Sequence, residues 1–166
     1  MAGMRLAILL LAAALSASAE FRRVEVDFEG TGCASCAESL PARLGRVRGV
    51  ESVEVDLSRN RVTIRLQAGN KTRLAPLVSR ITQDGTKIRR VETVVRGKIA
   101  RQGDGLSLLP SGLTETYRLR PGERASRLNP QNEVLYEIRG VFSDAEPGAE
   151  SSLEAESIEA LPAESR

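Results

Sequence analysis

The stretch that decides the fold lies between residues 24 and 36, and its sequence is VEVDFEGTGCASC. Apolar and charged residues alternate from Val24 to Phe28, which predicts a half-buried strand. A glycine-containing loop then leads to Cys33 and Cys36, which open a helix. They are the only cysteines of the chain, and it has no histidine. The pair is therefore a two-thiolate metal site, a redox dithiol or a disulfide.

The residues that follow the cysteines predict a helix and then a hairpin. Gly49 ends the helix, and Pro41 is expected to kink or delay it, because proline lacks a backbone N–H. Alternating residues predict strands at 53–57 and 62–66, with Asn60 available for the positive φ of the turn. The apolar face of the helix consists of Leu40, Leu44 and Val47.

A second helix and a last strand complete this half of the chain. Asn70 or Thr72 is expected to cap the helix, Gly85 to end it, and a strand to begin near Lys87. The order β-α-β-β-α-β predicts a ferredoxin-like domain at residues 20–91, with two helices on one face of a four-stranded antiparallel sheet. The buried face of the second helix consists of Leu74, Leu77, Val78 and Ile81.

This order of elements begins with a strand, a loop and a helix that opens with Cys-x-x-Cys. The combination resembles that of a known protein family. The residues that carry it are Gly30, Thr31, Gly32, Cys33 and Cys36, supported by Gly49-Val50, Val53–Val55 and Val62–Ile64. Here the chain resembles the heavy-metal-associated domain family of copper chaperones, metal-pumping ATPases and periplasmic mercury-binding proteins. The resemblance implies that Cys33 and Cys36 bind one soft metal ion. The family usually has methionine in place of Thr31, so a looser loop or a weaker site is expected.

Thiol chemistry at this position favours a soft metal ion. The thiolate is the ligand, and a helix N-terminus near Cys36 favours a negative sulfur. Two thiolates without a third protein ligand suit Cu(I), Ag(I) or Hg(II) better than Zn(II), which takes four ligands. Cu(I) is the first expectation. The nearest carboxylates in the sequence are Glu29 and Glu38, and neither is expected to be a ligand.

Lys87 and the redox state of the cysteines leave alternatives open. Lys87 lies where the family brings a loop near the metal, so its charge would offset that of a bis-thiolate complex; otherwise it is a solvated lysine. The cysteine pair, in turn, is alternatively a redox dithiol or a plain disulfide. A disulfide would close a very small loop and stabilise the fold little.

The second half, residues 92–161, predicts a small all-β domain that is barrel-like or an open sandwich. Turn placement gives it a weak resemblance to oligonucleotide/oligosaccharide-binding barrels, from which no ligand is inferred. It has no cysteine, histidine or catalytic motif, so no enzyme is expected, and it is expected to dock a partner or cover part of the first domain. The expected strands lie at or near 94–99, 106–109, 114–119, 133–142 and 153–158.

The N-terminus predicts export. Residues 1–19 combine Arg5, an apolar run from Leu6 to Leu15 and the small-x-small site at 17–19, which is typical of a signal peptide. The mature chain is expected to begin at Glu20 and to be periplasmic or secreted, and the alternative is an uncleaved anchor. No later stretch approaches the length of a membrane span. An oxidising compartment favours closure of the cysteine pair into a disulfide.

Charge is uneven along the chain. Seven of its 22 acidic residues lie from Asp144 onward, where Arg166 is the one basic residue, and this part, ending in the tail 162–166, is expected to be solvated. The basic residues lack interleaved aromatics, so nucleic-acid binding is not expected.

Together these features predict an exported protein that carries or sequesters one soft metal ion, with a membrane metal transporter or another exported metal protein as partner. The alternative is a non-metal interaction module whose cysteines form a disulfide.

Overall fold

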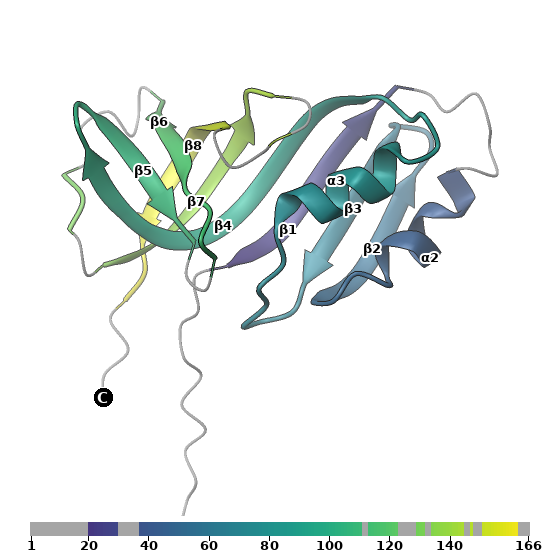
Figure 1. Cartoon of the computed structure of the whole chain (residues 1–166), viewed down its shortest axis with the longest axis horizontal. Coiled ribbons are helices and arrows are strands. Elements are labelled where there is room, and N and C mark those ends of the chain that lie inside the picture. The colour runs from purple at the N-terminus through teal and green to yellow at the C-terminus, as the bar shows by residue number, and fades with distance from the viewer. Residues whose placement is uncertain are drawn as a thin grey trace, which may run out of the picture.

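The computed structural model describes residues 20–29, 37–110, 113–122, 129–131, 134–144, 147 and 151–162. Within these residues no helix is long and apolar enough to span a bilayer. Figure 1 shows the elements in space. They are β1 (Phe21–Phe28), α2 (Leu40–Leu44), β2 (Val50–Asp56), β3 (Arg61–Leu66), α3 (Leu74–Thr82), β4 (Ile88–Gln102), β5 (Gly105–Leu109), β6 (Tyr117–Pro121), β7 (Leu135–Phe142) and β8 (Ser152–Ala160).

The N-terminal half has the ferredoxin-like arrangement that the sequence predicts. Its strands lie in the order β2-β3-β1-β4, and every neighbouring pair is antiparallel. Helices α2 and α3 cover one face of this sheet (Figure 1). Asn60 has a φ of 51° in the turn between β2 and β3, as expected. The core between helices and sheet is built from aliphatic side chains, among them Val24, Val26, Leu40, Leu44, Ile64, Leu74, Leu77 and Ile81.

Pro41 lies just after a break in the helical run, because Ala37 and Glu38 are helical, Ser39 is a turn, and α2 begins at Leu40. Helix α2 begins at Leu40, so Pro41 lies in its first turn, where a missing backbone N–H removes no helical hydrogen bond. The helix is only five residues long and ends at Leu44. Val47, expected on the same helical face, lies beyond the helix but still packs against the core.

The expected cap of the second helix is wrong. Helix α3 has Arg73 at its N-cap, without a side-chain capping bond. Asn70 instead accepts a hydrogen bond from the Thr72 N–H at 3.0 Å and donates one to the carbonyl of Phe21 at 2.8 Å. The Thr72 hydroxyl donates to the carbonyl of Arg48 at 2.8 Å. Both side chains therefore join distant segments of the domain, a role that competes with capping.

One long strand joins the two halves of the molecule. Strand β4 has 15 residues; residues 88–95 pair with β1, residues 92–98 pair with β7, and residues 98–102 pair with β5. The pairings β4-β5-β6-β8-β7 return to β4 and close a ring, in which β6 and β8 are parallel. Such closure leaves these five strands without a free edge. The expected boundary between the two halves, at residues 91 and 92, therefore lies inside one continuous strand.

The C-terminal strands match the expected positions with two differences. Strand β6 begins at Tyr117, later than the expected strand start at Thr114. The acidic C-terminal part is not wholly a solvated end, because Ser152–Ala160 forms β8. Leu153 and Ala155 of this strand are buried, and β8 pairs with both β6 and β7. The apolar residues therefore decide the structure here despite the acidic composition.

The ring of strands packs against the N-terminal end of β1. The Tyr117 ring makes edge-on contacts with Phe21, at 5.8 Å between ring centroids, and with Phe142, at 5.3 Å. The Tyr117 hydroxyl donates to Glu115 at 3.0 Å, and Arg73 lies 3.2 Å from the same carboxylate. Burial, followed by the Glu115 charge, raises the pKa of Tyr117 well above its ordinary value.

Candidate metal site

The segment that carries Thr31, Cys33 and Cys36, residues 30–36, lies outside the described residues. Its two flanks are described, and both are fixed to the core. Phe28 is fully buried, and its N–H donates to the carbonyl of Asn60 at 2.9 Å. On the other flank Ala37 and Leu40 are fully buried. Strand β1 and the first described helical residues therefore fix both flanks of the segment to the core.

Lys87 lies beside Glu29, the last described residue before this segment. The Glu29 N–H donates to the Lys87 carbonyl at 2.8 Å, and the Lys87 Nζ atom lies 3.9 Å from a Glu29 carboxylate oxygen. Both side chains are largely exposed, Lys87 by 77% and Glu29 by 57%. Lys87 thus lies next to Glu29, and its position relative to the cysteines stays a prediction. Glu38, on the downstream flank, is exposed.

Two further loops lie at the same end of the sheet as Glu29. The β2–β3 turn exposes Leu57, and its Asp56 accepts hydrogen bonds from the Ser58 hydroxyl and N–H, which lower the pKa of Asp56. In the α3–β4 loop, burial acts to raise the pKa of Asp84, but bonds from Thr86 and Arg43 outweigh it and lower that pKa. The Arg43–Asp84 ion pair, at 2.6 Å, fastens this loop to α2.

The described residues offer no second metal centre. Within the ranges that the structure describes, no group of three or more His, Cys, Asp or Glu side chains lies close enough to hold an ion. The carboxylates near Glu29 are engaged with Lys87, Arg43 or turn hydrogen bonds. The donor set proposed from the sequence, two thiols without a third ligand, is therefore the one to be tested.

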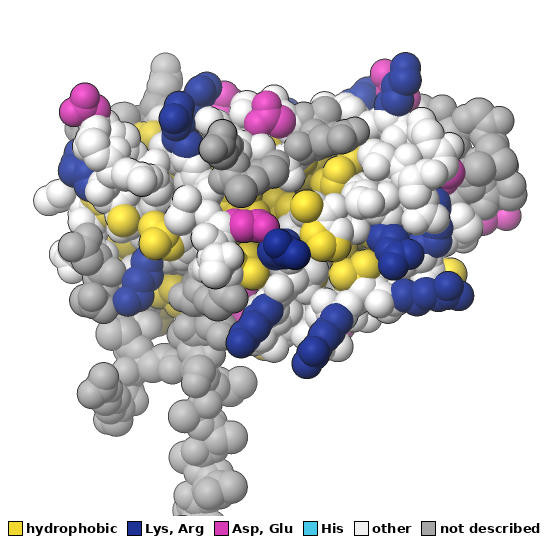
Figure 2. Space-filling model, in the orientation of Figure 1, with side chains coloured by type: hydrophobic (Ala, Val, Ile, Leu, Met, Phe, Trp, Pro, Cys, Tyr) yellow, Lys and Arg dark blue, Asp and Glu magenta, His cyan; other side chains and the backbone are white. Residues whose placement is uncertain are grey.

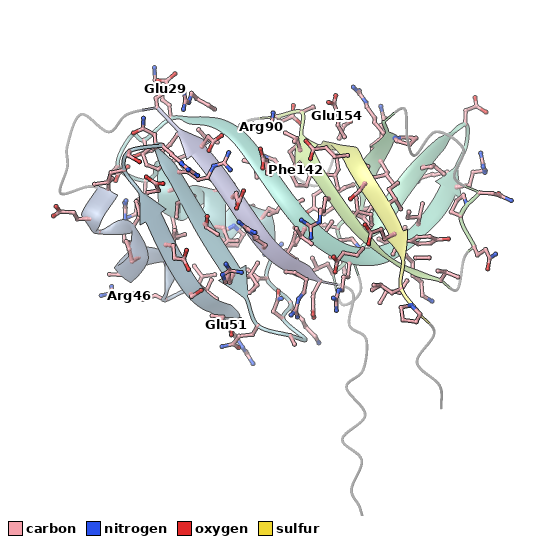
Figure 3. All side chains as sticks on the ribbon, turned by 180° about the vertical axis from the view of Figure 1, so that it is seen from behind. Glu29, Arg46, Glu51, Arg90, Phe142 and Glu154 are labelled. Atoms are coloured by element: carbon pink, nitrogen blue, oxygen red, sulfur yellow. The ribbon has the colours of Figure 1, made fainter. Side chains whose placement is uncertain are left out.

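The flanks of the cysteine segment lie far from the ring of strands. Phe28 pairs with Ile88 at the beginning of β4, whereas Phe21 pairs with Val95, beside the ring. In Figure 3, Glu29 lies at the end of the sheet away from Phe142 and Glu154, which belong to the ring. Among the described residues, the C-terminal half therefore packs at the opposite end of β1 from Glu29.

Charged side chains lie on the face of the sheet opposite the helices (Figure 3), and several of them form ion pairs. Arg61 binds Asp27 through two hydrogen bonds, of 2.6 and 2.9 Å, and lies 3.0 Å from Glu25. Arg90 lies 2.7 Å from Glu92 and 3.4 Å from Glu156 of β8, so it links the two carboxylates. A cavity of about 110 Å³ opens beside this network, but its carboxylates already face arginines. Alternation predicts a polar face here, but not these partners, which come from distant strands.

Comparison with known proteins agrees with the sequence-based resemblance. The model of the heavy-metal-associated domain family matches residues 25–87, a range that contains both cysteines. Residues 25–87 of this chain are therefore a heavy-metal-associated domain, which confirms the expectation for the N-terminal half. A comparison with curated proteins gave no match.

Solved structures similar to this one each cover about two fifths of the chain. One is a CopZ metallochaperone, with 21% identity over 40% of this chain and 98% of its own, and a TM-score of 0.37. Another is the N-terminal domain of a potential copper-translocating P-type ATPase from Bacillus subtilis in the Cu(I)-loaded state, with 26% identity, coverages of 42% and 85%, and a TM-score of 0.37. A third is oxidised MerP from Ralstonia metallidurans CH34, with 18% identity, coverages of 42% and 96%, and a TM-score of 0.36.

Proposed function

We propose that Cys33 and Cys36 hold one soft heavy-metal ion between two thiolates, and that the protein transfers or sequesters this ion outside the cytoplasm. The observation that carries the proposal is the match of residues 25–87 to the heavy-metal-associated domain, since the only two cysteines of the chain lie in that range. The ion is the cargo of the protein. Cu(I) is the first candidate, and Ag(I) and Hg(II) are its alternatives.

Donor chemistry supports a low coordination number. The chain has no histidine, and its two methionines, Met1 and Met4, lie in the proposed signal peptide. Two thiolates alone suit Cu(I), Ag(I) and Hg(II), whereas Zn(II) would need two more ligands. The ammonium group of Lys87, beside Glu29, would offset part of the negative charge of such a complex.

Transfer requires that a second thiolate protein reach the ion. The described ring of strands packs at the other end of β1 from Glu29, which supports such an approach. The ion would pass by stepwise thiolate exchange, in which a partner thiolate binds before one of the two cysteines leaves. A membrane metal transporter or another exported metal protein is the proposed partner, and no catalytic step is proposed. Export itself rests on residues 1–19.

An anaerobic metal titration of the reduced protein tests this function. Cu(I), Hg(II) and Zn(II) are added to the wild type and to the variants Cys33→Ser and Cys36→Ser. Ser35→Ala serves as the matched control, because it changes the same loop without removing a thiol. We expect one equivalent of Cu(I) or Hg(II) in the wild type and the control, and loss of that binding in both cysteine variants. Failure of all three metals with two free thiols would instead favour the interaction module.

A further inference from the structure

A basic groove lies at the end of the ferredoxin-like half that is remote from Glu29. It is formed by the loop between α2 and β2 and the loop between β3 and α3. The groove has a volume of about 600 Å³. Its lining includes two cations, Arg48 and Lys71, together with Gly49, Gln67, Gly69 and Asn70. The proposed metal function uses none of these residues.

The charge of this groove is not balanced by its own lining. Arg48 and Lys71 are exposed, and neither forms an ion pair within the part of the chain that the structure describes. No acidic residue lines the groove. The carboxylate of the buried Glu20 accepts a hydrogen bond from the Gly69 N–H, but Arg22 lies 2.8 Å from that carboxylate and balances its charge. Figure 2 shows Lys and Arg side chains gathered along the lower edge of the helix-bearing face.

Hydrogen bonds fix the two loops that form the groove. The Gln67 N–H donates to the Gly49 carbonyl at 2.9 Å, and the Thr72 hydroxyl donates to the Arg48 carbonyl at 2.8 Å. Gly49 has a φ of 93°, and a Cβ atom there would collide with the Thr72 hydroxyl. The loops therefore meet closely, and the backbone that positions Arg48 and Lys71 does not need to be ordered when a ligand binds.

We propose that this groove binds a phosphate-type oxyanion, either a free phosphate compound or the phosphate of a lipid headgroup. Arg48 supplies a planar guanidinium that matches two oxyanion oxygens, and Lys71 supplies a point charge. The Gln67 side-chain amide supplies a further donor at the lining. The length of the sheet separates this groove from Glu29, so an anion in the groove and a metal ion on the proposed cysteine site would bind at the same time.

The two sources are distinguished with two probes on the reduced, metal-free protein. Inorganic phosphate is titrated while backbone amide signals are followed by NMR. Vesicles of phosphatidylglycerol and of phosphatidylcholine are used in co-sedimentation. The test variant is Arg48→Gln/Lys71→Gln. The control variant, Arg80→Gln/Arg89→Gln, removes the same charge from two exposed positions outside the groove.

We expect saturable binding of phosphate or of phosphatidylglycerol vesicles, with NMR shifts centred on Gly49, Gln67, Gly69 and Asn70. The double groove variant should bind about tenfold more weakly or worse, because two charge-assisted contacts are lost. Saturable binding of phosphate would identify a free phosphate compound as the ligand class. Binding to phosphatidylglycerol vesicles without binding of phosphate would identify a lipid headgroup. Absence of both, equal binding to phosphatidylcholine, or an equal loss in the control variant would overturn the proposal.

Discussion

Arg61 on β3 donates two parallel hydrogen bonds to the carboxylate of Asp27 on β1, at 2.6 Å from Nε and 2.9 Å from Nη2. The same guanidinium lies 3.0 Å from Glu25 and 3.6 Å from Glu92. One arginine therefore faces carboxylates from two neighbouring strands, β1 and β4. Bidentate geometry of this kind is the condition under which a partly exposed ion pair contributes measurably.

We expect Arg61→Gln to lower the free energy of unfolding by about 1 kcal/mol at neutral pH, because it removes the bidentate partner of Asp27 while Glu25 and Glu92 stay nearby. Urea denaturation measures the change. Arg65→Gln is the matched control on the same strand, since Arg65 only approaches the exposed Glu54 at 4.0 Å. An equal effect of both substitutions would argue against a specific role of the Arg61 pair.

The Arg61 pair also predicts how stability depends on pH. The hydrogen bond from Arg61 lowers the pKa of Asp27 below its ordinary value of 3.8. A carboxylate with a lowered pKa stabilises the fold above the ordinary value, and the contribution is lost as pH falls below 3.8 through the lowered pKa. The acid-induced loss of stability should therefore be smaller in Arg61→Gln than in the wild type. Parallel stability curves for the two proteins between neutral and acid pH would contradict this assignment.

Gly49 is predicted to tolerate no side chain. In Gly49→Ala, the new Cβ would collide with the Thr72 hydroxyl at a positive φ, so we expect a loss of about 2–3 kcal/mol. Gly69→Ala is the control, because Gly69 also has a positive φ but no atom lies within 4 Å of the position that a Cβ would occupy. It should cost about 1 kcal/mol. Thermal unfolding of both variants measures the difference, and equal losses would mean that the contact with Thr72 is unimportant.

Tyr117 is predicted to hold the two halves together through its hydroxyl as well as its ring. Tyr117→Phe keeps the contacts with Phe21 and Phe142 but removes the hydrogen bond to Glu115, so we expect a loss of about 1 kcal/mol. Because the pKa of Tyr117 is raised, its contribution is present below 10.0, its ordinary value, and is lost as pH rises above it. Ultraviolet titration should show a late tyrosinate transition that Tyr117→Phe lacks. If both proteins have the same titration curve, Tyr117 is not the buried group described.

Lys87 is predicted to make only a small contribution to metal binding. Its ammonium is mostly exposed and lies near Glu29, so Lys87→Gln should weaken Cu(I) binding by about twofold. Competition with a chromophoric Cu(I) chelator measures the affinity, and Arg89→Gln is the control for a general loss of charge. A tenfold loss specific to Lys87→Gln would mean that the lysine contacts the complex directly.

Periodicity predicted most of the fold because the buried residues obey it. Val24, Val26 and Phe28 are all fully buried, as their alternation indicates, and so are Leu74 and Ile81 on the second helix. The same rule located β8 within an acidic segment, where composition alone suggested a solvated end. Apolar spacing therefore proved more informative than the charge of the surrounding residues.

Polar roles were predicted less well because their partners are distant in sequence. Asn70 resembles a helix cap, but its amide reaches Phe21, 49 residues away. Likewise, no local pattern could pair Arg90 with Glu156, 66 residues away. The Cys-x-x-Cys motif identified the family because its signal is local, and the match to residues 25–87 agrees with it.

X-ray absorption spectroscopy of the Cu(I)-loaded protein at the copper edge tests the proposed two-thiolate site most directly. We predict a two-coordinate ion with two sulfur ligands, supplied by Cys33 and Cys36, and a spectrum that Ser35→Ala leaves unchanged. A nitrogen or oxygen ligand in the first coordination sphere, or a copper ion that remains bound when both cysteines are replaced by serine, would contradict it.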